Sequence, residues 1–93
     1  MLLGTRILPG RVLMTDQQIL DTLSRILSDL LGDESIVLKM ELARADVPGW
    51  DSFNYVNFIV AVESQLNVKF NLAEIESFEN VGAIVSRTKA MLQ

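Results

Sequence analysis

The strongest structural signal in this sequence is an amphipathic segment between residues 15 and 32. Thr15 and Gln18 have the spacing of a capping box, in which each side chain accepts a hydrogen bond from the other residue's backbone N–H. Behind them, apolar side chains recur at intervals of three and four residues: Ile19, Leu20, Leu23, Ile26, Leu27, Leu30 and Leu31. This pattern predicts a helix from Asp16 to Leu31 with one apolar face, ended by Gly32.

Three further segments carry helix signals. Asn71 and Glu74 repeat the capping-box spacing, and Asn80 precedes another apolar periodic stretch. Helices are expected from Asp51-Ser52 to Leu66, over residues 72–76 and over residues 81–92. Because strand-like alternation covers no useful length, the expected fold is all-α: a four-helix bundle with three long helices and one short one.

Two stretches lack this periodicity. Residues 33–50 run into Val47-Pro48-Gly49-Trp50, and we expect a long, partly buried loop with a short helical turn between the first two helices. Residues 1–14 precede the Thr15 cap, so we expect an N-terminal extension followed by a single domain at 15–93. The alternative is an ordered arm that packs on the bundle through Leu2, Leu3, Ile7 and Leu8.

The chain contains no Cys and no His. Disulfides, thiolate zinc sites, cysteine nucleophiles and imidazole-based catalysis are therefore excluded. The acidic residues are scattered, without the pairing that carboxylate catalysis needs or the spacing of a metal site. We expect a protein that is not an enzyme, with no catalytic residue and no metal site.

The charge is distributed unevenly. Residues 15–93 contain all 12 acidic residues and only 6 basic ones, which gives this part a net charge of −6. Such a surface repels nucleic acid and suits a basic protein surface.

No apolar run approaches the roughly 20 residues of a membrane span, and the N-terminus lacks the unbroken apolar stretch of a secretory signal. We expect a cytoplasmic protein.

The helix that begins at Ser52 has two apolar faces, although a bundle helix needs only one. The ordinary core face consists of Tyr55, Phe58, Ile59, Val62 and Leu66. At about 100° per residue, a second face lies roughly 130° away, and it consists of Phe53, Val56 and Val60. This second face either packs under the 33–50 loop, which periodicity alone favours, or is presented to a partner or ligand.

The start of the same helix combines Pro48-Gly49-Trp50 with Asp51-Ser52. A hydroxyl at this place lies near unpaired backbone N–H groups and the positive end of the helix dipole, which together stabilise a phosphate. Asp and Ser are also common capping residues, so a capping role alone is the alternative. Ser52 has no neighbouring base in the sequence, so another enzyme would have to modify it.

From Thr15 to Leu92 the chain resembles the acyl carrier protein family, the phosphopantetheine-binding four-helix carriers of fatty-acid and polyketide pathways. The family has Asp-Ser-Leu at the start of its second helix, and this chain has Asp51-Ser52-Phe53, followed by an apolar run to Glu63. The resemblance implies that Ser52 is the attachment site of 4′-phosphopantetheine and that Asp51 is recognised during attachment. Implied partners are the carrier-protein synthase (a phosphopantetheinyl transferase) and enzymes that load and use the acyl group.

The resemblance also implies contact roles for the second apolar face, whose positions flank the arm and meet partner enzymes. Phe78 would help gate an acyl cavity, with a plain core role as the alternative. Asn54, Asn57 and Ser64 stand where fatty-acid carriers are often acidic. We therefore predict a specialised, monomeric carrier that docks less through ion pairs than through Trp50, Phe53, Asn54, Val56, Asn57 and Val60.

Two other functions stay open at this point. A peptidyl or aryl carrier differs from an acyl carrier mainly in the partner that loads it. An unmodified helical interaction module would use Ser52 only as a cap and the second apolar face as a permanent docking surface.

Overall fold

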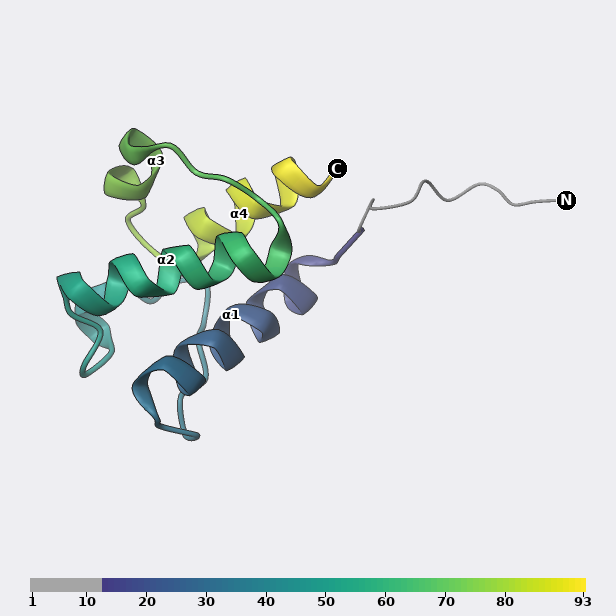
Figure 1. Ribbon diagram of the computed structural model, residues 1–93. Helices are drawn as coiled ribbons and strands as arrows, with labels where there is room; N and C mark the ends of the chain where they lie inside the picture. Colours follow the sequence, from purple (N-terminus) through teal and green to yellow (C-terminus); the bar gives the residue numbers. More distant parts are fainter. Residues whose placement is uncertain (1–12) are drawn as a thin grey trace, which may run out of the picture.

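The computed structural model describes residues 13–93, in which four α-helices pack around one hydrophobic core. Figure 1 shows how the helices are arranged. The element order is α1 (Asp16–Leu31), the short 3₁₀ turn η1 (Arg44–Asp46), α2 (Ser52–Leu66), α3 (Leu72–Ser77) and α4 (Val81–Leu92). No strand occurs within residues 13–93. The predicted all-α bundle and the helical turn in the long loop are confirmed, and α3 runs one residue further than predicted.

Helix α1 contacts both α2 and α4. Its apolar face is buried as its spacing predicts, except that Leu30 is exposed and Leu31 is half-buried at the C-terminal end. An ion pair also joins the start of α1 to the last turn of α4, because the Nζ atom of Lys89 lies 3.1 Å from a carboxylate oxygen of Asp16. The core consists mainly of Ile19, Leu23, Ile26, Leu27, Leu38, Phe58, Ile59, Val62, Val81, Ile84 and Val85.

The loop between α1 and α2 is fastened to α1 and α4 by backbone groups. Leu38 N–H donates to Ser24 Oγ at 2.9 Å, and Gly82 N–H at the start of α4 donates to Met40 O at 2.8 Å. A Cβ atom at residue 82 would lie 3.1 Å from that same carbonyl oxygen. Glycine at this helix position therefore permits the close approach of the loop.

Residues 1–12, which make up most of the predicted extension and include all four apolar residues of the alternative arm, lie outside the described residues. Of the remainder, Leu13 is exposed and Met14 packs against the core. No described helix is both long enough and apolar enough to cross a membrane.

Candidate functional site

A glycine turn and an aspartate cap place Ser52 at the exposed start of α2. Gly49 adopts a positive φ of 87°, which suits glycine and turns the chain into the helix. Asp51 then caps α2, because its Oδ1 accepts a hydrogen bond from Asn54 N–H at 2.8 Å. Ser52 is exposed, and its hydroxyl forms no hydrogen bond with another residue of the 13–93 region. The hydroxyl of Ser52 is therefore not the cap of this helix.

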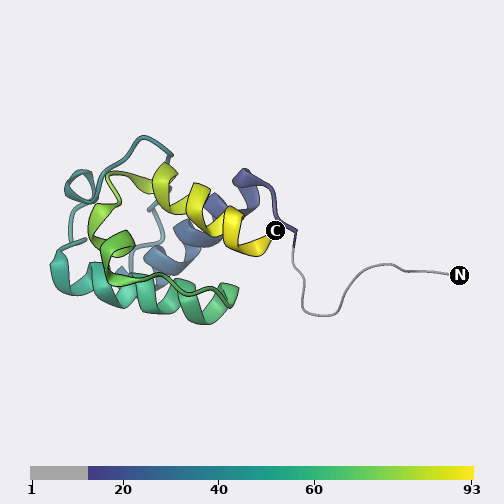
Figure 2. The same ribbon diagram turned by 90° about the horizontal axis from the view of Figure 1, so that it is seen from above.

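Ser52 lines a cavity of about 610 Å³ between α2, α3 and the η1 turn. Its apolar walls include Val56, Leu72 and Ile75, whereas Arg44, Glu76 and Glu79 bring charge to it. Figures 1 and 2 both show α3 beside the N-terminal half of α2, which is why one space borders both helices. The cavity can hold an organic group next to the Ser52 hydroxyl.

Tyr55 joins α2 to α3 at this cavity. Its hydroxyl donates a hydrogen bond to the backbone oxygen of Ile75 at 2.6 Å. The guanidinium carbon of Arg44 lies 5.1 Å from the centre of the Tyr55 ring, a cation–π distance. Burial raises the pKa of the Tyr55 hydroxyl, which Arg44 partly opposes, so this hydroxyl remains a neutral donor at physiological pH.

Trp50 does not occupy the surface predicted for it. Its side chain is only 4% exposed, and its ring packs edge-on against Phe58 with centroids 5.0 Å apart. A second aromatic contact joins it to Tyr55 at 6.2 Å. The prediction that Trp50 docks a partner is therefore wrong, because the indole fills the core behind the start of α2.

The second apolar face of α2, formed by Phe53, Val56 and Val60, is open to solvent. These side chains are 75%, 56% and 56% exposed. The interpretation favoured by periodicity alone, that the 33–50 loop covers this face, is wrong, because the loop packs on α1 and α4. Leu72 at the start of α3 is 68% exposed and borders the same cavity. Leu72 was not among the contact residues predicted from the sequence. Its place directly after the Asn71 cap could have indicated an apolar side chain at an exposed helix start.

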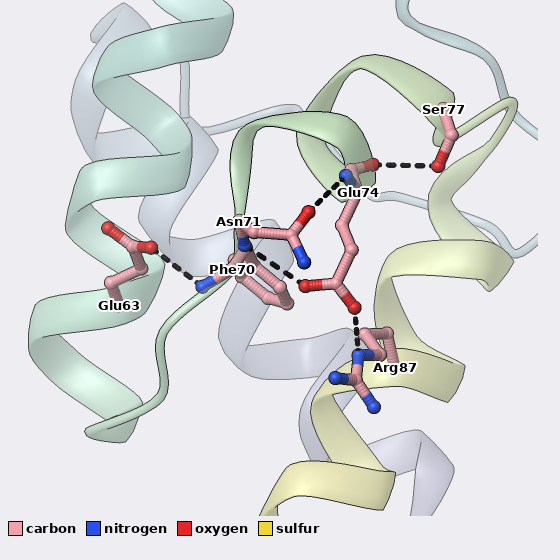
Figure 3. A network of polar contacts seen from close by, with 6 residues as sticks. All are labelled: Glu63, Phe70, Asn71, Glu74, Ser77 and Arg87. Atoms are coloured by element: carbon pink, nitrogen blue, oxygen red, sulfur yellow. Dashed lines mark hydrogen bonds and ion pairs between the residues drawn. The ribbon is translucent and has the colours of Figure 1, made fainter.

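The polar residues of α2 are largely engaged within the protein. Asn54 Nδ2 donates to Gly49 O at 3.0 Å, so this amide fastens the helix start, and Asn57 is half-buried. Glu63 accepts a hydrogen bond from Phe70 N–H at 2.9 Å, as Figure 3 shows, and lies 3.8 Å from Lys69 Nζ. The second apolar face of α2 therefore contains no charged residue, and Glu63, one turn beyond Val60 at its edge, is engaged with the segment that follows the helix.

Phe78 and α3 form the other side of the cavity. The half-buried Phe78 ring lines this space and packs edge-on against Phe70 at 5.5 Å, so one side chain serves both the cavity wall and the core. Helix α3 is held by the Asn71–Glu74 capping box and by an ion pair between Glu74 and Arg87 (Figure 3). The hydrogen bond from Asn71 N–H, with a smaller contribution from Arg87, holds the pKa of Glu74 below its usual value against the effect of desolvation.

No model of a protein family matches the chain. An acyl carrier protein of Clostridium acetobutylicum is 34% identical to it over 65 residues, which cover 70% of this chain and 84% of that relative. The chain belongs to the acyl carrier protein family. A solution NMR structure of holo acyl carrier protein from Geobacter metallireducens matches it with a TM-score of 0.74 and 35% identity, covering 80% of this chain and 85% of that one. Members of this family are carriers and not enzymes, so this chain acts as a carrier protein.

Proposed function

We propose that this carrier holds an acyl group as a thioester on a 4′-phosphopantetheine arm attached to Ser52. The observation that carries the proposal is the Ser52 hydroxyl, which is exposed, free of hydrogen bonds within the described region, and placed at the mouth of a cavity. The neighbouring acyl carrier structure is of the holo form. Asp51 would be the acidic residue that the modifying enzyme recognises.

The residues around Ser52 suit a phosphodiester. Backbone N–H groups at the start of α2 lack helical partners, and the helix dipole places partial positive charge there. Arg44 lines the same cavity and adds a full positive charge, which the carboxylates of Glu76 and Glu79 oppose there. When bound, the arm supplies the thiol that a chain without Cys lacks. The protein's own residues then shelter the cargo, and tethering raises its effective concentration at each partner.

The second apolar face of α2, extended by Leu72, is the proposed docking surface for a phosphopantetheinyl transferase and for enzymes that load and use the acyl group. Because Phe53, Val56, Val60 and Leu72 are apolar, docking depends on apolar contact at close range, while the carboxylates of Glu76 and Glu79 border the cavity beside Val56 and Leu72. We propose a specialised carrier for fatty-acid, lipid or polyketide-type biosynthesis, which acts as a monomer in the cytoplasm.

Intact mass measured after incubation with coenzyme A and a phosphopantetheinyl transferase tests the proposal. We expect a gain of one phosphopantetheine, lost in Ser52→Ala and kept in Ser64→Ala, which removes an exposed hydroxyl from the same helix. A gain that persists in Ser52→Ala contradicts the assignment of the site. No gain with several transferases supports an unmodified interaction module instead.

A further inference from the structure

We propose that residues 71–80, which contain α3, form a hinged flap over the cavity beside Ser52, and that the Tyr55 hydroxyl is the latch that holds this flap against α2. The latch is a property of the unmodified chain. Its consequence, that opening of the flap admits the chain of a cargo, rests on the carrier function of Ser52 proposed above.

Buried side chains and backbone hydrogen bonds anchor the chain on both sides of the flap. Before it, Phe70 is buried and its N–H donates to the Glu63 carboxylate of α2, as Figure 3 shows. After it, Val81 is buried, and the N–H groups of Val81 and Gly82 donate to backbone oxygens of the loop between α1 and α2 at 2.9 and 2.8 Å. The flap can therefore move away from α2 while both of its ends stay in place.

The helix between these anchors is weakly held. None of the six residues of α3 is fully buried, and a helix of this length is not stable by itself in water. Its capping box and the hydroxyl of Ser77, which donates to Glu74 O, lie within the flap and connect it to no other helix. Within residues 13–93, the polar contacts from α3 to other helices are the partly exposed Glu74–Arg87 ion pair and the hydrogen bond from Tyr55.

The hydrogen bond from Tyr55 is well placed to act as the latch. Its hydroxyl donates to Ile75 O at 2.6 Å in a partly buried position. Ile75 is among the last four residues of α3, whose carbonyl groups have no partner within the helix, so this bond satisfies an acceptor that α3 cannot satisfy by itself. The Tyr55 ring is held in turn by Trp50 at 6.2 Å and by Arg44 at 5.1 Å.

The latch separates the cavity at Ser52 from the interior of the bundle. Behind it lies a pocket of about 20 Å³ lined by Trp50, Tyr55 and Phe78, among others, and this volume accommodates a single water-sized group. An acyl chain that extends inward from Ser52 therefore needs the flap to open. Tyr55 sets the balance between a chain that stays in the outer cavity and one that enters the bundle.

Native-state hydrogen exchange of the unmodified chain tests the latch. Because α3 is too short to stay helical after release, we expect its amides to exchange as one unit, through an opening with a smaller urea dependence than global unfolding. Tyr55→Phe removes the latch and keeps the ring, so it should raise the exchange rates of α3 about tenfold. Ser77→Ala, which removes an exposed hydroxyl bond within α3, should raise them by no more than about twofold.

Unchanged α3 exchange in Tyr55→Phe, or an equal increase in Ser77→Ala, overturns the latch. Neither result depends on modification of Ser52, so the latch and the carrier function are tested separately.

Octanoyl and acetyl groups, loaded at Ser52 from their coenzyme A thioesters by a phosphopantetheinyl transferase and verified by mass, test the consequence. We expect Tyr55→Phe to slow hydrolysis of the octanoyl thioester several-fold at mildly alkaline pH, because a chain inside the bundle shelters its thioester from water. Hydrolysis of the acetyl thioester, which is too short to pass the latch, should stay the same. Equal octanoyl hydrolysis in the two proteins overturns control of entry by Tyr55, and failure of every loading reaction overturns the carrier proposal.

Discussion

At the scale of single residues, the start of α2 places two neighbouring aromatic side chains in opposite environments. Trp50 is 4% exposed and packs against Phe58, whereas Phe53, three residues later, is 75% exposed. A buried aromatic side chain contributes strongly to the free energy of unfolding, whereas a largely exposed one contributes little. The two residues therefore have different functions: Trp50 supports the site from behind, and Phe53 is available to a partner.

Truncating Trp50 should destabilise the fold far more than truncating Phe53. We expect Trp50→Ala to lower the free energy of unfolding by about 3–5 kcal/mol, because it leaves a cavity in the core. Phe53→Ala should change this free energy by no more than about 0.5 kcal/mol. Urea unfolding of both variants provides the measurement. Similar losses in the two variants would contradict the burial described for Trp50.

The residue scale is also where prediction from sequence was least complete. An aromatic residue just before a helix cap faces inward or outward depending on the path of the preceding loop, and spacing along the chain carries no information about that path. For this reason Trp50 was predicted to contact a partner or an acyl chain, although its burial rules out a docking role at the surface. The exposure of Phe53, Val56 and Val60 followed from helix geometry once the loop was known to pack elsewhere.

At the scale of elements, α3 has only six residues, too few for a helix that is stable by itself. It is held from three sides. Its own capping box satisfies the first turn, Arg87 of α4 pairs with Glu74, and Tyr55 of α2 donates to Ile75 O. Because α3 forms one wall of the cavity, these contacts also set the shape of the site.

Removing the charge of Glu74 should lower the free energy of unfolding near neutral pH. It should also make the loss of stability at acidic pH smaller. The folded protein holds the pKa of Glu74 below its usual value, so the ionised side chain stabilises the fold above the unfolded-state pKa of about 4.3. That contribution is lost as the pH falls through the lower, folded-state pKa. Glu74→Gln lacks it at every pH.

Urea unfolding at neutral pH and below the usual glutamate pKa measures this effect in Glu74→Gln and in Glu76→Gln. Glu76 is an exposed residue of the same helix that forms no hydrogen bond or ion pair through its carboxylate within residues 13–93. An acid-induced loss of stability in Glu74→Gln as large as in the unaltered chain would refute the role given to this carboxylate.

Element boundaries were predicted well because caps and apolar spacing are local. Thr15, Asn71 and Asn80 cap helices as their sequence contexts indicate, and Asn67 ends α2 in the left-handed conformation. The position of the long loop was not predictable in this way. It depends on backbone hydrogen bonds between segments distant in sequence, such as the bond from Gly82 N–H to Met40 O.

At the scale of the whole molecule, an acidic chain presents an uncharged face beside its attachment site. Residues 15–93 carry a net charge of −6, yet Phe53, Val56 and Val60 have no charged residue among them. Long-range attraction to a basic partner would still act through the whole body. Close contact at α2 would rest on apolar burial, which salt does not screen as it screens ion pairs.

Adding acidic charge to α2 should therefore fail to improve docking. We expect Asn57→Asp to leave kcat/KM unchanged or lower with the transferase that modifies the chain most efficiently, whereas Val60→Ala lowers kcat/KM by removing exposed apolar surface. Rates at low and high ionic strength provide the measurement, because a new ion pair would be screened by salt. A large, salt-sensitive gain in Asn57→Asp would show that charge limits docking.

The most direct test of the carrier function is the intact mass of the acylated chain before and after treatment with neutral hydroxylamine, which cleaves thioesters. With Ser52 modified and loaded, we expect the acyl mass to disappear while the phosphopantetheine mass remains. The Ser52→Ala variant should show neither mass at any stage. An acyl mass that resists hydroxylamine, or one that is present in Ser52→Ala, would contradict a thioester carried on Ser52.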